Sequence, residues 1–338
     1  MTNPQPNTPN TSFSTINPSL QLAIDSTSLN TFETCAQKYN LSIRLGYAPR
    51  TESVHLTFGL LLHSAIETYH HLRACPEGME SARSHDWALQ CVIKRTMRAT
   101  WDQSNDRPLL FDHPIKNRFT LIRTIIFYLD LYRDDPLKTV TLPNGKPAVE
   151  LSFSFDSGYH TTTTSERVII CGHLDRFTSL HSSYYISDIK STGSTISPSY
   201  FDGFTPSNQI TIYTIAAQTA FLFEAEGVLI DALQITQSGM GGKANAPTSP
   251  LSLFKRRLIT RSPFQLNEWH TKLGIRLAEL EQCATTNVWP MRETSCDLYG
   301  GCPYRPVCSQ PSPQSRQIVL DSLYTRRVWD PLQRRGDV

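Results

Sequence analysis

The amino-terminal part of the chain repeats its apolar residues with the spacing of helices. Leu62, Ile66 and Tyr69 recur three and four positions apart, which places them on one apolar face. The same period predicts helices over three segments: residues 57–74, 82–103 and 117–133. We therefore expect residues 27–135 to be mainly helical.

The pattern then changes to alternation. Leu151, Phe153 and Phe155 stand at every second position, which predicts a strand with one buried face. Further elements are predicted as strands at residues 167–177, 183–190 and 228–237 and as helices at residues 206–226 and 263–286. A turn at Ser182-Ser183 would make the middle two strands an antiparallel hairpin. The order of elements predicts an α/β core sheet with a helical insertion on its amino-terminal side.

Composition sets the outer limits of the folded region. Residues 1–20 are rich in Asn, Thr, Pro and Ser and predict a flexible tail. Residues 311–338 form a basic tail through Arg326, Arg327, Arg334 and Arg335. Between the tails we expect one domain over residues 21–310. Its parts are a helical part (27–135), a core (139–237) and a late helix with a Cys-rich segment (263–310).

Charge and hydropathy bound the class of protein. The formal charge of the 338-residue chain is +2, so any surface for nucleic acid must be local. The sequence contains neither a signal-peptide pattern nor an apolar run long enough to span a bilayer, and we expect a cytoplasmic protein without membrane contact. Thiols stay reduced in that compartment. The eight cysteines therefore favour metal or cluster ligation over a disulfide framework.

An acidic pair and a lysine fall on two neighbouring predicted strands. Asp188 and Lys190 are two positions apart and project from the same side of one strand, and Asp175 on the preceding strand can reach the same point. Converging carboxylates bind a hard cation such as Mg²⁺ or Mn²⁺, which activates water. The D-x-K triplet by itself is more typical of an ordinary ion pair.

Two helical patterns add polar residues to this set. His63 lies four residues after Gly59 on a predicted helix and is a further metal-ligand candidate. Gln209 and Tyr213 share a helical face after the lysine strand, where an amide and a phenol can hold a DNA backbone or the lysine. Taken alone, His63 is more typical of a structural hydrogen-bonding residue, and the Gln209/Tyr213 pair of a partly buried polar pair.

The order G-x3-H, G-x-x-D-R, D-x-K and Q-x3-Y resembles the RecB-like branch of the PD-(D/E)xK nucleases. That branch includes exonuclease V, the AddB nuclease domain and the CRISPR-associated accessory nuclease, and the resemblance covers residues 27–310. It implies a restriction-endonuclease-like core with a mixed sheet flanked by helices and a carboxyl-terminal iron–sulfur staple. It also implies metal ligation by His63, Asp175 and Asp188, catalysis by Lys190, and support of the site and DNA contact by Gln209 and Tyr213. Leu174 departs from the proline of the family name.

Four cysteines have the spacing of a ligand set. Cys296, Cys302 and Cys308 are separated by five residues each, and Cys35 is the natural fourth ligand. Four thiolates suit zinc and iron–sulfur equally well. The resemblance selects a 4Fe–4S cluster and leaves Zn²⁺ as the alternative.

A basic cluster follows a Gly-, Pro- and Ser-rich loop at residues 239–250. Its members Lys255, Arg256, Arg257 and Arg261 are candidates for nucleic-acid contact, with a solvated charged turn as the equal alternative.

Together the motifs predict a Mg/Mn-dependent deoxyribonuclease that hydrolyses phosphodiester bonds. The resemblance implies an exonuclease on single strands or DNA ends in recombination, repair or replication. The alternatives are a non-catalytic DNA-end-binding or assembly subunit, against which the intact acidic pair argues, and an unrelated zinc-stapled binding protein. Since no P-loop appears, any unwinding would come from a partner such as a helicase or recombination protein.

Overall fold

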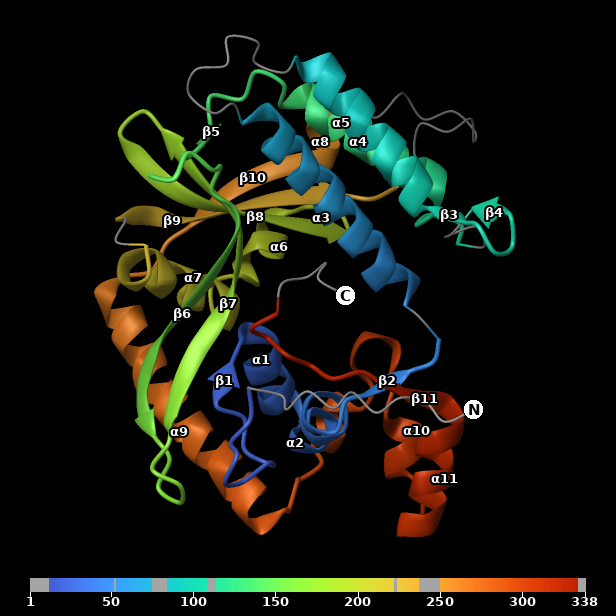
Figure 1. Cartoon of the computed structure of the whole chain (residues 1–338), viewed down its shortest axis with the longest axis vertical. Helices are drawn as coiled ribbons and strands as arrows, with labels where there is room; N and C mark the ends of the chain where they lie inside the picture. Colours follow the sequence, from blue (N-terminus) through green and yellow to red (C-terminus); the bar gives the residue numbers. More distant parts are fainter. Residues whose placement is uncertain are drawn as a thin grey trace. The chain divides into compact units, whose positions relative to one another are not determined.

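Figure 1 shows the computed structural model, which describes residues 12–51, 53–74, 84–108, 113–221, 224–236 and 250–333. The chain forms two compact units. Unit 1 comprises Met1–Thr51, Ser152–Gly172 and Ser262–Val338, and unit 2 comprises Glu52–Leu151 and His173–Arg261. The expected single domain over residues 21–310 is thus divided between the two units.

A mixed sheet forms the centre of unit 2. Its strands are β5 (Lys138–Thr139), the second part of β7 (Arg167–Leu180), β8 (Ser183–Thr192), β9 (Ala225–Gln234) and β10 (Phe254–Ile259). β6 (Val149–His160) pairs with β7, and residues 152–172 of these two strands belong to unit 1. The β7–β8 and β9–β10 pairs are antiparallel, whereas β8 and β9 are parallel. A parallel pair needs a crossover, which α6 (Pro198–Asp202) and α7 (Asn208–Thr219) supply. The predicted α/β class with a central mixed sheet is confirmed, and the predicted β7–β8 hairpin is present.

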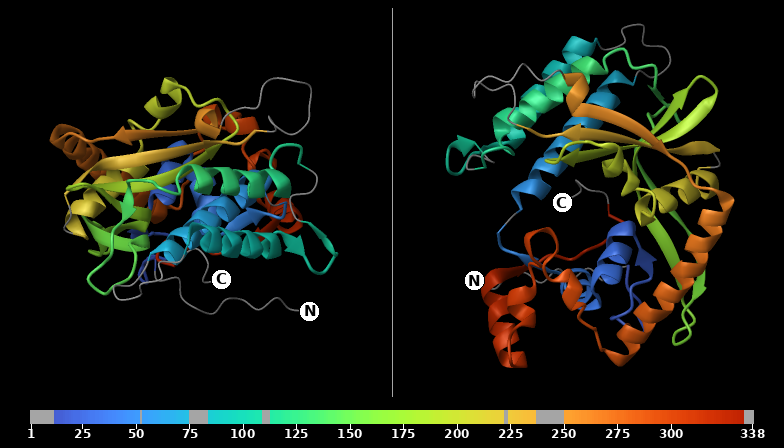
Figure 2. Two further views of the ribbon diagram at one scale, coloured as in Figure 1. Left: turned by 90° about the horizontal axis from the view of Figure 1, so that it is seen from above. Right: turned by 180° about the vertical axis from the view of Figure 1, so that it is seen from behind.

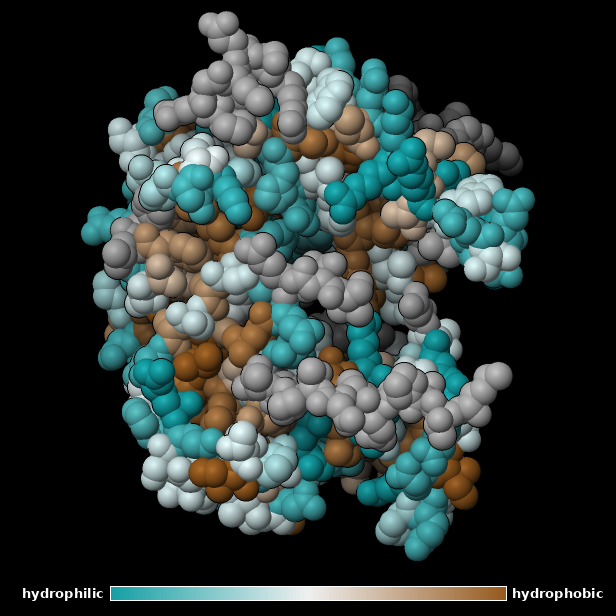
Figure 3. All heavy atoms as spheres, in the orientation of Figure 1, coloured by the Kyte–Doolittle hydropathy of each residue, from teal (hydrophilic) through white to brown (hydrophobic). Residues whose placement is uncertain are grey.

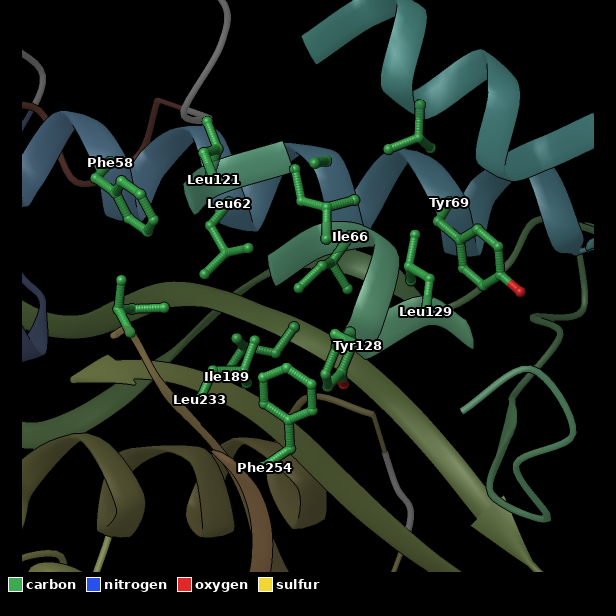
Figure 4. Close-up of a cluster of buried hydrophobic side chains, with 14 of the residues drawn as sticks. Phe58, Leu62, Ile66, Tyr69, Leu121, Tyr128, Leu129, Ile189, Leu233 and Phe254 are labelled. Carbon is green, nitrogen blue, oxygen red and sulfur yellow. The ribbon is translucent and has the colours of Figure 1, made fainter. Parts of the chain in front are cut away.

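Three helices cover one face of this sheet and α7 the other (Figures 1 and 2). They are α3 (Val54–Arg73), α4 (His85–Ala99) and α5 (Arg118–Leu131). Phe58, Leu62 and Ile66 of α3 are fully buried and point toward Ile189 and Leu233 of the sheet (Figure 4). This apolar face is the one that the helical spacing predicted. It holds α3 in a fixed position against the strands.

Short elements complete unit 2. A small hairpin of β3 (Trp101–Asp102) and β4 (Arg107–Pro108) follows α4, where the sequence predicted continued helix. The short helix α8 (Pro250–Leu253) precedes β10. A buried polar contact ties the three covering helices together, because His85 of α4 lies 2.8 Å from both Tyr69 Oη of α3 and Asp130 Oδ1 of α5.

Unit 1 contains the long helix α9 (Pro263–Thr286) and several short elements. These are β1 (Ala23–Ile24), α1 (Ser26–Thr34), α2 (Ala36–Tyr39), a π-helix (Asn40–Arg44), β2 (Tyr47–Pro49), 3-10 turns (Glu293–Ser295 and Leu298–Gly300), α10 (Arg305–Cys308), α11 (Pro313–Leu323) and β11 (Tyr324–Arg326). β1 pairs with β7, and β11 pairs with β2.

Both expected tails are shorter in the structure than in the prediction. Leu20 is buried, and the Ser12 carbonyl accepts hydrogen bonds from Leu22 and Ala23, so residues 12–20 pack against unit 1. At the other end α11 and β11 occupy most of the expected basic tail. Arg334 and Arg335 lie outside the described residues, as does most of the loop predicted at 239–250.

No helix among the described residues is long and apolar enough to cross a membrane.

Candidate active site

The two aspartates meet where β7 and β8 stop pairing. The paired register ends at Arg176 and Ser187, which places Asp175 and Asp188 at the next position of each strand. Asp175 Oδ2 accepts a hydrogen bond of 3.0 Å from the backbone N–H of Ile189. The diverging strands thus bring the two carboxylates together, as the alternation of the strands led us to expect.

Lys190 and His63 complete this group. Lys190 Nζ lies 2.6 Å from Asp188 Oδ2, and His63 Nδ1 of α3 lies 3.4 Å from Asp175 Oδ2. His63 reaches the strands because the apolar side of α3 is packed on the sheet. Four residues from three elements of unit 2 therefore form one cluster, His63, Asp175, Asp188 and Lys190.

The charges of the cluster shift its proton affinities in opposite directions. Burial raises the pKa of Asp175, but His63 and Lys190 lower it more and hold it at about 2. Burial raises the pKa of Asp188, and the neighbouring Asp175 adds to this, with only partial compensation by Lys190. Burial lowers the pKa of His63, yet Asp175 outweighs it and the net pKa is raised. The site therefore combines a carboxylate that stays ionised with one that is costly to ionise in isolation.

Gln209 and Tyr213 hold the backbone of β7. The Tyr213 hydroxyl donates a 2.9 Å hydrogen bond to the carbonyl oxygen of His173, two residues before Asp175. Gln209 Nε2 donates to the same hydroxyl at 2.8 Å. These two hydrogen bonds connect the pair to the strand of Asp175, which favours support of the site.

A family model for the PD-(D/E)XK nuclease superfamily matches residues 26–309. The chain belongs to the PD-(D/E)XK nuclease superfamily. Membership indicates a nucleolytic enzyme that acts on nucleic acid, and PD-(D/E)XK nucleases generally use divalent metals. No curated protein matches the chain. A solved structure titled "Crystal structure of SSO0001" is 12% identical, with a TM-score of 0.25, and the match covers 70% of this chain and 89% of that one.

The donor set of this PD-(D/E)XK site suits a divalent metal. Asp188 is fully buried; among the described residues its Oδ1 has no hydrogen-bond partner, and its Oδ2 is contacted by the Lys190 ammonium at 2.6 Å. A buried carboxylate in this state requires a cation, and at present Lys190 supplies the nearest charge. Among the described residues, no three His, Cys, Asp or Glu side chains are already arranged as a metal-holding group. The carboxylates and the imidazole of this cluster therefore fit a hard divalent metal in chemistry.

A small cavity adjoins the cluster and is also lined by residues that were not predicted as site residues. It has a volume of about 20 Å³ and is lined by His63, Asp175, Glu67, His70, Glu150, Arg176 and Asp231, among others. That volume accommodates one water molecule. Glu67 and His70 follow His63 by one and two helical turns, so helical spacing was the signal that could have found them. Glu150 has a left-handed φ of 50°, a strained conformation that clusters at functional sites.

The predicted basic cluster is engaged within the protein. Arg256 Nε lies 2.8 Å from Asp231 Oδ2, and Arg256 Nη1 lies 2.5 Å from Asp135 Oδ2. These two ion pairs favour a structural role for Arg256 over contact with phosphate. This outcome was hidden from the sequence because Asp135 is 121 residues away.

The other three members of the cluster are also bonded internally. Lys255 donates to the carbonyl oxygen of Ile196, and Arg257 pairs with Asp202 at the surface. Arg261 donates to Thr211 and to the carbonyl oxygen of Phe204, which fixes the start of α7. Lys255 and Arg257 are exposed, whereas Arg261 is half-buried.

The four predicted ligand cysteines all belong to unit 1, where the backbone N–H of Cys302 donates to the carbonyl oxygen of Cys296. Burial and the neighbouring Cys302, Cys35 and Cys296 raise the pKa of Cys308 to about 11. Cys35 Sγ also accepts a hydrogen bond from the backbone N–H of Arg292. All four are free thiols. Their chemistry suits a four-thiolate centre.

Proposed function

We propose that the chain is a metal-dependent DNA nuclease that hydrolyses phosphodiester bonds. The observation that carries this proposal is the convergence of His63, Asp175, Asp188 and Lys190 at the point where two strands diverge. Membership in the PD-(D/E)XK nuclease superfamily supports it.

Each residue has a defined role in the proposal. His63, Asp175 and Asp188 would hold Mg²⁺ or Mn²⁺, which when bound polarises a phosphate oxygen and lowers the pKa of a coordinated water. The Lys190 ammonium would donate a hydrogen bond to the phosphate oxygen on which negative charge develops, and Asp188 would then be available as a metal ligand. Gln209 and Tyr213 would keep β7 in register so that the Asp175 carboxylate stays in place.

The finer proposal is an exonuclease that acts on single strands or DNA ends in recombination, repair or replication. The order of the motifs supports it by resemblance. Because no P-loop is present in the sequence, a helicase or recombination protein would supply unwinding.

A cleavage assay on 5′- and 3′-labelled single-stranded and double-stranded DNA tests both the nuclease proposal and the finer exonuclease proposal. With Mg²⁺ or Mn²⁺, wild type should degrade DNA, and Asp188→Ala should not. The matched control is Asp86→Ala, which removes an aspartate of unit 2 whose side chain is 76% exposed. If Asp188→Ala cuts as fast as Asp86→Ala, the nuclease proposal fails. If closed circular DNA is cut internally, the proposal of an exonuclease fails, whereas the proposal of a nuclease stands.

We also propose that Cys35, Cys296, Cys302 and Cys308 hold a 4Fe–4S cluster, with Zn²⁺ as the alternative. Iron and sulfide analysis and the visible spectrum of anaerobically purified protein distinguish the two. Cys308→Ser should abolish the bound metal, whereas Cys283→Ser, a free thiol outside the set, should not. Equal metal content in both variants would exclude this ligand set.

A further inference from the structure

We propose that the end of α4, the β3–β4 hairpin and the first turn of α5 form a docking surface for single-stranded nucleic acid. We call it the hairpin surface and define it by Lys94, Arg98, Trp101, Arg107, Arg118 and Phe119. The choice of nucleic acid as the occupant rests on the proposed nuclease function.

The first argument is charge. Residues 94–119 contain six basic and three acidic residues, so this short segment carries more net charge than the +2 of the whole chain. Lys94 and Arg98 are exposed, and a spacing of four puts them on one side of α4. Arg107 on β4 is exposed as well. A local excess of exposed cations complements a phosphate backbone.

The second argument is the arrangement of rings beside these cations. The Arg118 guanidinium lies 5.3 Å from the centre of the Trp101 ring. It is fixed there because Nε donates to Thr100 Oγ1 and Nη2 donates to the carbonyl oxygen of Met97. The side chain is therefore preorganised, and the binding of a ligand would cost little further side-chain entropy.

The third argument favours a single strand over a duplex. Phe119 is 70% exposed and Trp101 is 36% exposed. Exposed aromatic faces beside cations are the chemistry on which unpaired bases stack, whereas the bases of a duplex are already stacked on each other. In Figure 3, hydrophilic residues gather over the β3–β4 hairpin at the end of α4.

The surface lies near the amino-terminal end of the helix that carries His63. Lys116, just before α5, lies 5.8 Å from the centre of the Phe58 ring of α3. Phe58 precedes His63 by five residues, which is about 7.5 Å along a helix axis. The residue that leads into the first turn of α5 thus contacts the same helix that carries His63, five residues before it.

The test measures binding of a labelled oligothymidylate by fluorescence anisotropy in EDTA, over a range of salt concentrations. Lys94→Gln/Arg98→Gln is compared with Lys146→Gln/Lys272→Gln, which removes two exposed lysines elsewhere. Two lost phosphate contacts should reduce the salt-dependence slope by about 1.4 and weaken binding about 25-fold at about 0.1 M salt. Phe119→Ser should weaken binding at least about fivefold without a change in slope, unlike Phe264→Ser, whose ring is 75% exposed.

The outcomes separate this inference from the proposed nuclease. If the Lys94/Arg98 variant binds with the Kd and slope of its control, the hairpin surface is wrong even when wild type cleaves DNA. If wild type cleaves nothing but shows the expected losses, the surface stands and the nuclease proposal fails. A duplex that binds as tightly as the single strand, with Phe119→Ser neutral, would overturn the choice of a single strand.

Discussion

Replacement of Arg256 by methionine distinguishes a structural arginine from a nucleic-acid contact. Methionine keeps an unbranched side chain and removes the charge. The wild-type guanidinium contacts Asp231 and Asp135 and lies 3.7 Å from the centre of the Tyr132 ring. Asp231 is 1% exposed, and its Oδ1 has no hydrogen-bond partner among the described residues. The substitution would leave this carboxylate buried, with the Tyr128 hydroxyl as its remaining donor in the part of the chain that the structure describes.

The magnitude follows from that burial. Removal of one partner from a buried ion pair costs about 3–5 kcal/mol of unfolding free energy. For a unit of this size that corresponds to a melting temperature lower by about 6–20 °C. The penalty should shrink as the pH falls, because burial already raises the pKa of Asp231 and a protonated Asp231 needs no counter-charge.

The assay is urea or thermal unfolding, with Arg257→Met as the matched control. Arg257 is the next residue of β10, but its side chain is 46% exposed and pairs with an exposed Asp202. Its loss should cost less than about 1 kcal/mol. In the double variant Arg256→Met/Asp231→Leu the loss should be smaller than the sum of the single losses. Equal stability of the two methionine variants, together with weaker DNA binding by Arg256→Met alone, would refute the structural role.

Three further predictions concern single contacts. Tyr213→Phe removes the donor to His173 and should lower kcat about fivefold with KM unchanged, because one hydrogen bond contributes about 1 kcal/mol; a change in KM alone would point to DNA contact instead. Burial raises the pKa of Glu281, but hydrogen bonds from Thr163 and Tyr159 lower it from 4.5 to about 2, so its stabilisation is complete above pH 4.5 and lost as the pH falls through 2. Glu281→Gln should therefore remove up to about 3 kcal/mol at neutral pH and flatten acid unfolding over that window, and an unchanged acid transition would contradict the assignment. His85→Leu should cost about 1–3 kcal/mol in urea unfolding because it leaves the buried Tyr69 hydroxyl without its partner, while Asp130→Asn, at a half-exposed position, should cost less.

Local periodicity predicted those features that depend only on the direction in which the backbone of a helix or strand points its side chains. Alternation along β8 places Asp188 and Lys190 on one side whatever surrounds the strand, and the helical spacing of α3 presents its buried face to the sheet. The β7–β8 hairpin was predictable for the same reason, since its turn is short and its strands are adjacent in the chain. These features depend on residues within a few positions of each other.

Only the tertiary structure decided which distant groups meet. The sequence showed Arg256 in a basic run after a loop, whereas strand β10 pairs it with Asp231 and sets it against Asp135. Composition predicted a flexible tail that includes Leu20, which is in fact buried. Tyr213 finds its acceptor at His173, 40 residues away. The physical reason is the same in each case. The partner of a charge or of an apolar side chain depends on which strands and helices pack together, and the spacing of residues along the chain does not determine that packing.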